Sequence, residues 1–91
     1  MERSKVYELI DGERDYQDTK WAGTCSGNGI GTGALDRSVD EFALYISAYT
    51  AELVQIASHT GNPRSSLDAI RKIAALSVAC MEAHGGVPRK L

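Results

Sequence analysis

Residues 38–59 read SVDEFALYISAYTAELVQIASH, and this stretch decides the fold. Its large apolar side chains recur at steps of three and four residues, which is the spacing of one face of an α-helix. They are Val39, Phe42, Ile46, Tyr49, Leu53 and Ile56. Ser38 and Glu41 have the spacing of a capping box, which marks a helix start. The pattern therefore predicts a helix over residues 38–59 with a coiled-coil-like seam of about five turns.

A short helix and a glycine-rich loop are predicted before this stretch. Apolar side chains at helical spacing predict a helix over residues 3–18. Gly12 weakens this helix, so we expect a bend or a break there. Residues 22–37 contain five glycines within eleven positions and no periodic apolar pattern, which predicts a loop. A loop of this length in so small a domain is either a mobile connector or a functional lid.

A second long helix is predicted after the first. Thr60-Gly61-Asn62-Pro63 predicts a helix end and a short turn. The next helix is expected over residues 65–84, with Ser65 as its N-cap. Its buried side is expected to consist of Leu67, Ile70, Ile73, Ala74, Leu76, Ser77, Cys80 and Met81. Because the turn is short, the two long helices must be antiparallel neighbours, and their apolar surface predicts pairing with a second chain.

The predicted fold class is therefore all-α. We expect an antiparallel helical hairpin plus a short N-terminal helix, in a single domain of residues 1–91 that assembles into an oligomeric helical bundle. The chain has 91 residues, of which 43% are hydrophobic and 24% are charged. A core of this size is marginal in one chain, which favours a core shared in a homo-oligomer.

Composition also excludes several classes of protein. The formal net charge of -2 gives no reason to expect duplex nucleic acid as a partner. No apolar run is long enough for a signal peptide or a membrane helix, so we expect no membrane partner. Cys25 and Cys80 show neither a disulfide framework nor metal-ligand spacing, which predicts free thiols and a cytoplasmic location. The histidines, His59 and His84, have no nucleophile at useful spacing.

Candidate ligand contacts gather first in residues 13–21, ERDYQDTKW. Tyr16 and Trp21 are suited to stacking on a base, and Arg14 and Lys20 are suited to contacting phosphate. The alternative is a solvated helix whose single Trp anchors it to the bundle.

The two long helices carry further candidates. Tyr45 and Glu52 share one face of the 38–59 helix, where Glu52 is suited to a metal or a ligand hydroxyl, or belongs to a solvent-facing polar stripe. Arg71 and Lys72 suggest a phosphate site. Asp68, three and four residues before them, equally fits an ordinary surface ion-pair arrangement.

The segment Glu13-Arg14-Asp15-Tyr16-Gln17-Asp18-Thr19-Lys20-Trp21 resembles the E-R-x-x-Q-D-x-K-W opening of short MazG-like proteins, many of them encoded by bacteriophages. The helix holding Glu52 and the helix from Asp68 to Met81 look like the acidic and alanine-rich helices of that family. The resemblance implies an all-α nucleotide pyrophosphohydrolase fold, assembled as a dimer or tetramer. It implies cleavage of a nucleoside triphosphate to a monophosphate and pyrophosphate, with Mg²⁺ held by an E-x-x-E pair on one helix and an E-x-x-D pair on the next.

The sequence departs from this acidic pattern at two positions. Gln55 stands three residues after Glu52, and Arg71 stands three residues after Asp68. Mg²⁺ prefers several hard oxygen ligands, so two carboxylates would hold it poorly. Arg71 would repel the metal and attract phosphate, and we therefore expect no metal site and no cofactor.

The leading hypothesis is a phage-type protein of the host cytoplasm that binds a nucleotide or nucleotide-derived signalling molecule at a subunit interface without cleaving it. Its use would be to sequester a host defence signal. The expected ligand-binding residues are Arg14, Tyr16, Lys20, Trp21, Tyr45, Glu52, Arg71 and Lys72, with no catalytic residue. The first alternative is a Mg²⁺-dependent pyrophosphohydrolase that uses Glu52, Asp68 and Glu41. The second is an interaction module that inhibits a host protein through an exposed helix face.

Overall fold

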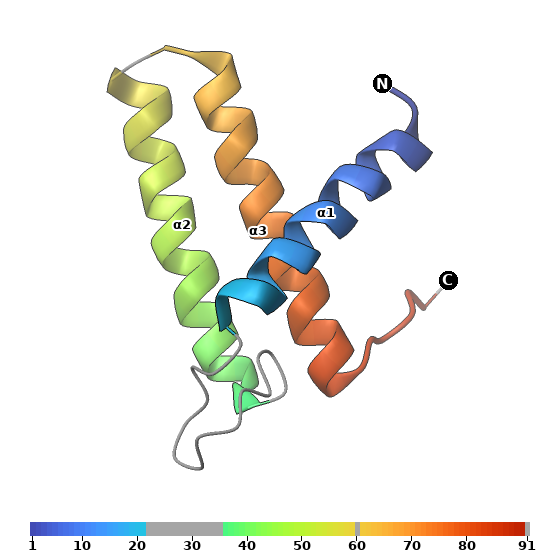
Figure 1. Cartoon of the computed structure of the whole chain (residues 1–91). Helices are drawn as coiled ribbons and strands as arrows, with labels where there is room; N and C mark the ends of the chain where they lie inside the picture. Colours follow the sequence, from blue (N-terminus) through green and yellow to red (C-terminus); the bar gives the residue numbers. More distant parts are fainter. Residues whose placement is uncertain (22–35, 60, 91) are drawn as a thin grey trace.

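Three helices form the part of the chain that the computed structural model describes, which is residues 1–21, 36–59 and 61–90. They are α1 (Arg3–Trp21), α2 (Val39–His59) and α3 (Pro63–His84), and these residues contain no strand. The predicted all-α class is confirmed for them. α2 and α3 run side by side in opposite directions, while α1 lies across α3 and its N-terminal half projects away from the other helices (Figure 1). α3 is therefore the central helix, in contact with both of the others.

The start of α2 follows from its capping residues. The Glu41 N–H donates to Ser38 Oγ at 3.0 Å, and the Ser38 N–H donates to Glu41 Oε1 at 3.1 Å. This reciprocal pair satisfies two backbone donors that the first turn leaves without helical partners. The predicted capping box is confirmed. Most of the predicted glycine-rich loop, residues 22–35, lies outside the described residues.

The start of α3 differs from the prediction. The helix begins at Pro63, and Asn62 is its N-cap, with Asn62 Oδ1 accepting from the Arg64 N–H at 3.0 Å. The expected Ser65 cap was wrong, because Pro63 has the backbone angle that the first helical position needs and lacks only an N–H that would have no helical partner there. Gly85, with φ 90°, ends the helix and donates its N–H to the Met81 carbonyl at 2.7 Å.

α1 is longer and more regular than predicted. It runs through Gly12 without a break and extends to Trp21 instead of ending at residue 18. Arg14 and Gln17, in the second half of α1, are buried. The packing of these two side chains outweighs the low helix propensity of one glycine, which destabilises a helix by about 1 kcal/mol relative to alanine. Gly12 itself is exposed, and a Cβ added there would meet no atom within 4 Å.

The buried apolar core is small and rich in alanine. Among the described residues it consists of Phe42, Ala69, Ala75, Leu76 and Ala79. The predicted buried side of α3 was partly wrong, since Leu67, Ile70 and Met81 are 64%, 48% and 52% exposed. Both α1 and α2 pack on α3. Small side chains on α3 allow these helices to approach closely, because the distance between two packed helices depends on the side chains at their contact. None of the described helices combines the length and apolar character needed to cross a membrane.

Phe42 joins the three helices at one end of the core. Its ring lies 6.4 Å from the Trp21 ring at the end of α1 and 6.3 Å, edge-on, from the His84 ring at the end of α3. His84 Nε2 lies 2.7 Å from the Arg37 carbonyl oxygen, the geometry of a hydrogen bond donated by the ring. The ends of α1 and α3 are thereby tied to the beginning of α2.

Candidate functional site

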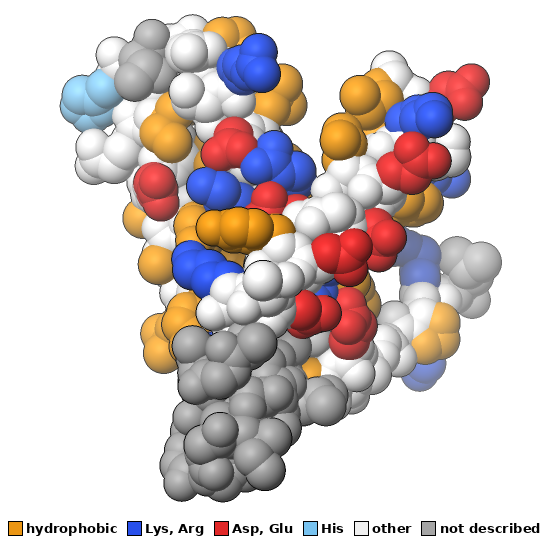
Figure 2. Space-filling model, viewed as in Figure 1, with side chains coloured by type: hydrophobic (Ala, Val, Ile, Leu, Met, Phe, Trp, Pro, Cys, Tyr) orange, Lys and Arg blue, Asp and Glu red, His pale blue; other side chains and the backbone are white. Residues whose placement is uncertain are grey.

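A cleft of about 590 Å³ is lined by side chains from all three helices. Each helix contributes residues at spacings of three or four, which place them on one helix face. α1 contributes Glu13, Tyr16, Gln17, Lys20 and Trp21, α2 contributes Tyr45 and Tyr49, α3 contributes Asp68, Arg71, Lys72 and Leu76, and Arg37 precedes α2. Lys and Arg side chains gather beside an apolar side chain between α2 and α1 in Figure 2. The cleft thus combines aromatic surface with positive charge.

The structure brings six of the eight expected ligand-binding residues together in this cleft: Tyr16, Lys20, Trp21, Tyr45, Arg71 and Lys72. Arg14 and Glu52 are not among the lining residues. Arg14 is buried with only 4% of its surface exposed, and Glu52 is exposed on α2. All three expected aromatic residues and three of the four expected cations therefore line the cleft, whereas the expected acid, Glu52, does not.

Several residues that line the cleft are not among the expected ligand-binding residues. Tyr49 lies one helical turn after Tyr45, and Glu13 and Gln17 lie on the face of α1 that carries Tyr16 and Lys20. Because each of these three lies three or four residues from an expected ligand-binding residue, helical spacing alone could have predicted them. Arg37 carried no such signal, because it lies outside the helices and its position depends on how the chain packs.

Arg37 connects the aromatic side chains of the cleft. Its guanidinium carbon lies 4.5 Å from the centre of the Trp21 ring and 5.8 Å from the centre of the Tyr45 ring. Both distances are within the range of cation–π attraction. Arg37 thus holds one ring of α1 and one ring of α2 near a single positive charge.

The cations of α3 are held by two carboxylates. Arg71 Nε donates to Glu13 Oε1 at 2.9 Å, and the Glu13 side chain is only 9% exposed. Asp68 accepts a hydrogen bond from Arg71 and lies 3.2 Å from Lys72 Nζ. Hydrogen bonds from Arg71 and then Lys72 hold the pKa of Asp68 below its usual value, while the bond from Asp68 raises the pKa of Lys72. Asp68, Arg71 and Lys72 therefore all carry their charges at neutral pH.

Lys20 is in a different situation. It lies in the last turn of α1, is exposed, and forms no ion pair with any residue that the structure describes. With Arg37, Arg71 and Lys72 it gives the cleft four cations against the carboxylates of Glu13 and Asp68. The cleft is positive although the chain as a whole has a net charge of -2. Such a local field attracts anions.

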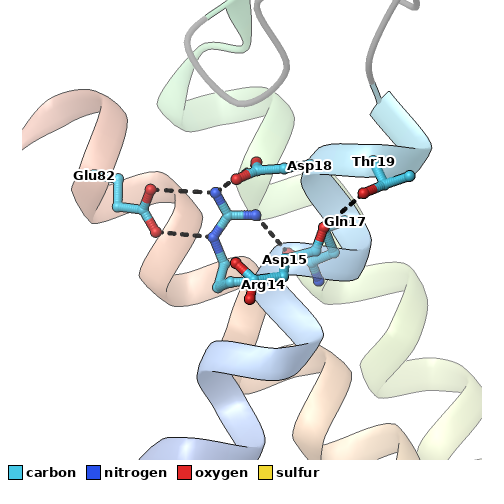
Figure 3. A network of polar contacts seen from close by, with 6 residues as sticks. All are labelled: Arg14, Asp15, Gln17, Asp18, Thr19 and Glu82. Carbon is cyan, nitrogen blue, oxygen red and sulfur yellow. Dashed lines mark hydrogen bonds and ion pairs between the residues drawn. The ribbon is translucent and has the colours of Figure 1, made fainter.

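Arg14 belongs to a separate polar network that fastens α1 to α3 (Figure 3). Its guanidinium donates to both carboxylate oxygens of Glu82, at 2.9 and 3.2 Å, and to Asp18 Oδ1 at 2.8 Å. Its remaining nitrogen donates to Gln17 Oε1 at 3.2 Å. We call Arg14, Gln17, Asp18 and Glu82 the Arg14 clamp. Its bidentate geometry is the strong form of an Arg–carboxylate contact, so Arg14 serves to position the α1 wall of the cleft.

The Arg14 clamp predicts a specific pH dependence of stability. The hydrogen bond from Arg14 lowers the pKa of Glu82, so the clamp stabilises the fold fully above the unfolded-state pKa of about 4. This stabilisation is lost as the pH falls through the lower folded-state pKa. Glu82→Gln should therefore lose less stability than the wild type between about pH 5 and pH 2, measured by urea unfolding at each pH. Glu52→Gln, which changes an exposed carboxyl outside the cleft, should follow the wild-type curve; an equal change in both variants would contradict the prediction.

The acids that the hydrolase alternative would use for Mg²⁺ do not fit such a site. Glu41 is engaged in the cap of α2, Glu52 does not line the cleft, and Asp68 is bonded to two cations. Within residues 1–21, 36–59 and 61–90, no three His, Cys, Asp or Glu side chains are grouped so that they could hold a metal ion.

Comparisons with protein-family models, with curated proteins and with solved structures find no match to this chain. The resemblance to MazG-like proteins therefore rests on the quoted residues alone.

Proposed function

We propose that the cleft binds a nucleotide or nucleotide-derived signalling molecule and holds it without cleaving it. The observation that carries the proposal is the presence of aromatic rings and cations in one cleft. Tyr16 lies on the α1 side, Tyr45 and Tyr49 lie on the α2 side, and Lys20 and Lys72 lie among them. Bases stack on aromatic rings, and phosphates accept charge-assisted hydrogen bonds from Lys and Arg.

The arrangement of the acids favours holding the ligand over hydrolysing it. Pyrophosphate release from a nucleoside triphosphate requires charge neutralisation at the phosphates, which Mg²⁺ usually supplies. The carboxylates in the cleft, Glu13 and Asp68, are bonded to Arg71 and Lys72. These acids hold the two cations in place and are themselves engaged by them. Binding of a nucleotide without cleavage would sequester the molecule.

One chain is sufficient to form the cleft, so the proposal does not depend on the oligomeric state. The direct test is calorimetric titration with nucleoside mono-, di- and triphosphates and with cyclic mono- and dinucleotides, with and without Mg²⁺. The recovered ligand is then analysed by chromatography. We expect binding of at least one member, without a requirement for Mg²⁺, and recovery of that ligand intact. Monophosphate and pyrophosphate formed only with Mg²⁺ would establish the hydrolase alternative, and absence of binding by the whole panel would overturn the proposal.

Lys20 provides a sharper test of the site. Lys20→Gln should weaken binding of the best nucleotide by about tenfold or more, because a hydrogen bond to a charged group contributes about 1.5–3 kcal/mol and 1.4 kcal/mol is a factor of ten. Lys5→Gln is the matched control, since Lys5 lies on the same helix, is 64% exposed and does not line the cleft. Titration of both variants should show a loss for Lys20→Gln only. Equal affinities would remove Lys20 from the site.

A further inference from the structure

The face of α2 that is turned away from its Phe42 seam carries exposed apolar side chains. We define the α2 outer face as Leu44, Ala48, Ala51, Val54, Gln55 and Ser58, all of them exposed. Leu44 is 70% exposed and Val54 is 58% exposed. Residues 44, 48, 51, 55 and 58 repeat at steps of four and three, which is the spacing of a helix-pairing seam. α2 therefore carries one seam toward α3 and a second on its opposite side.

The fully buried apolar core of the described residues is small. Of the five buried apolar residues among those described, Ala69, Ala75 and Ala79 contribute little apolar area. Small domains bury a modest fraction of their surface, so additional apolar burial against a second subunit would add to their stability. A partner that covers the α2 outer face would move Leu44 and Val54 out of water.

The charges at the ends of α2 indicate which partner fits. The first turn of α2 carries Asp40 and Glu41, its last turn carries His59, and Arg64 follows at the start of α3. Two copies of α2 packed antiparallel would place the acidic end of each beside the basic end of the other. Antiparallel packing also places the positive end of each helix dipole beside the negative end of its partner. A parallel arrangement would place Asp40 beside Asp40 and oppose like dipole ends.

We infer that a second copy of this chain packs its α2 antiparallel on the α2 outer face, about a twofold axis that passes near Ala51. In a twofold interface the same surface serves both chains, so a residue near the axis faces itself. Ala48 and Ala51 lie at the middle of the face, where small side chains allow two helices to approach closely. Leu44 of each chain then lies near Ser58 of the other. The inference is independent of the proposed function, because it uses none of the residues that line the cleft.

The test uses the full chain and the charge at position 51. Analytical ultracentrifugation should show that the wild type is a dimer or a larger even-numbered assembly. Ala51→Glu and Ala51→Lys should each dissociate this contact, because like charges then face each other across the axis. An equimolar mixture of the two variants should restore the contact through opposite charges. Ala57→Glu is the control: it makes the same change at an exposed position of α2 outside the defined face, and it should leave the assembly intact.

Three results would overturn the inference. The first is a monomeric wild type, which would leave the face to a different protein. The second is an assembly that survives Ala51→Glu, and the third is an assembly that dissociates with Ala57→Glu but not with Ala51→Glu. Circular dichroism of each variant reports whether the chain is folded. If Ala51→Glu alone is unfolded, the mixture with Ala51→Lys still decides, since recovery of both helicity and mass requires that the two positions meet. Failure to recover either would also overturn it.

Discussion

Phe42→Ala should lower the free energy of unfolding by about 3–5 kcal/mol, which is the range for removing a buried Phe from a core. Phe42 is fully buried, and its ring contacts Trp21 and His84 at the ends of the two other helices. The surrounding core offers mainly alanines, which cannot move in to fill the space that the ring leaves. Because typical domains are stable by only about 5–15 kcal/mol, this one substitution removes a large fraction of the total.

Urea unfolding followed by circular dichroism measures this loss. Leu67→Ala is the control, because Leu67 is apolar and 64% exposed, and its effect should stay within about 0.5 kcal/mol. Phe42→Leu should lie between the two. The prediction also concerns the cleft, since Trp21 both packs on Phe42 and lines the cleft. A Phe42→Ala variant as stable as the wild type would show that the three helix ends do not meet at Phe42.

Tyr16→Ala should weaken binding of the best nucleotide by about 5- to 150-fold, because stacking of a base on an aromatic ring contributes about 1–3 kcal/mol. Tyr16 lines the cleft yet is 60% exposed, so its removal leaves no cavity in the core. The effect should therefore appear in affinity and not in stability. Calorimetric titration and thermal unfolding, performed on the same samples, separate the two.

Tyr7→Ala is a closely matched control for Tyr16→Ala. Tyr7 lies on the same helix and is 62% exposed, but it does not line the cleft. Its substitution should leave the nucleotide affinity unchanged. If both variants bind like the wild type, the ring of Tyr16 does not contact the ligand. If both lose affinity equally, the effect comes from α1 as a whole and not from the cleft.

The helices were predictable because their signals are local. The Ser38–Glu41 capping box and the apolar seam that includes Phe42 are contained within residues 38–59, and the structure has this helix at Val39–His59. The errors came from interactions that the local pattern does not contain. Gly12 did not break α1, because Arg14 and Gln17 pack against α3. The inward side of α3 was misjudged because two helices pack on it, and such packing favours small side chains over the larger Leu67.

The aromatic and cationic residues of the candidate site could be predicted from their chemistry. Tyr16, Lys20 and Arg71 were named because aromatic and cationic groups suit nucleotides, and the structure brings them into one cleft. The same chemistry assigned Arg14 to phosphate, although its guanidinium is directed to Glu82 on α3. The local sequence does not distinguish an Arg that is free to bind a ligand from one, such as Arg14, that forms an ion pair with a carboxylate 68 positions away in the chain. Only the packing of α1 on α3 makes that distinction.

The consecutive residues Glu13 and Arg14 also select the direction in which α1 lies on α3. Glu13 meets Arg71, and Arg14 meets Glu82, so the two ties have opposite polarity and are separated by three turns of α3. If α1 lay on α3 in the reverse direction, Glu13 would face Glu82 and Arg14 would face Arg71, with repulsion at both places. If α1 rotated about its own axis by one residue, both ties would be lost together. Two adjacent residues of the sequence thereby disfavour the reversed direction of α1, a choice that a core made mostly of alanines leaves open.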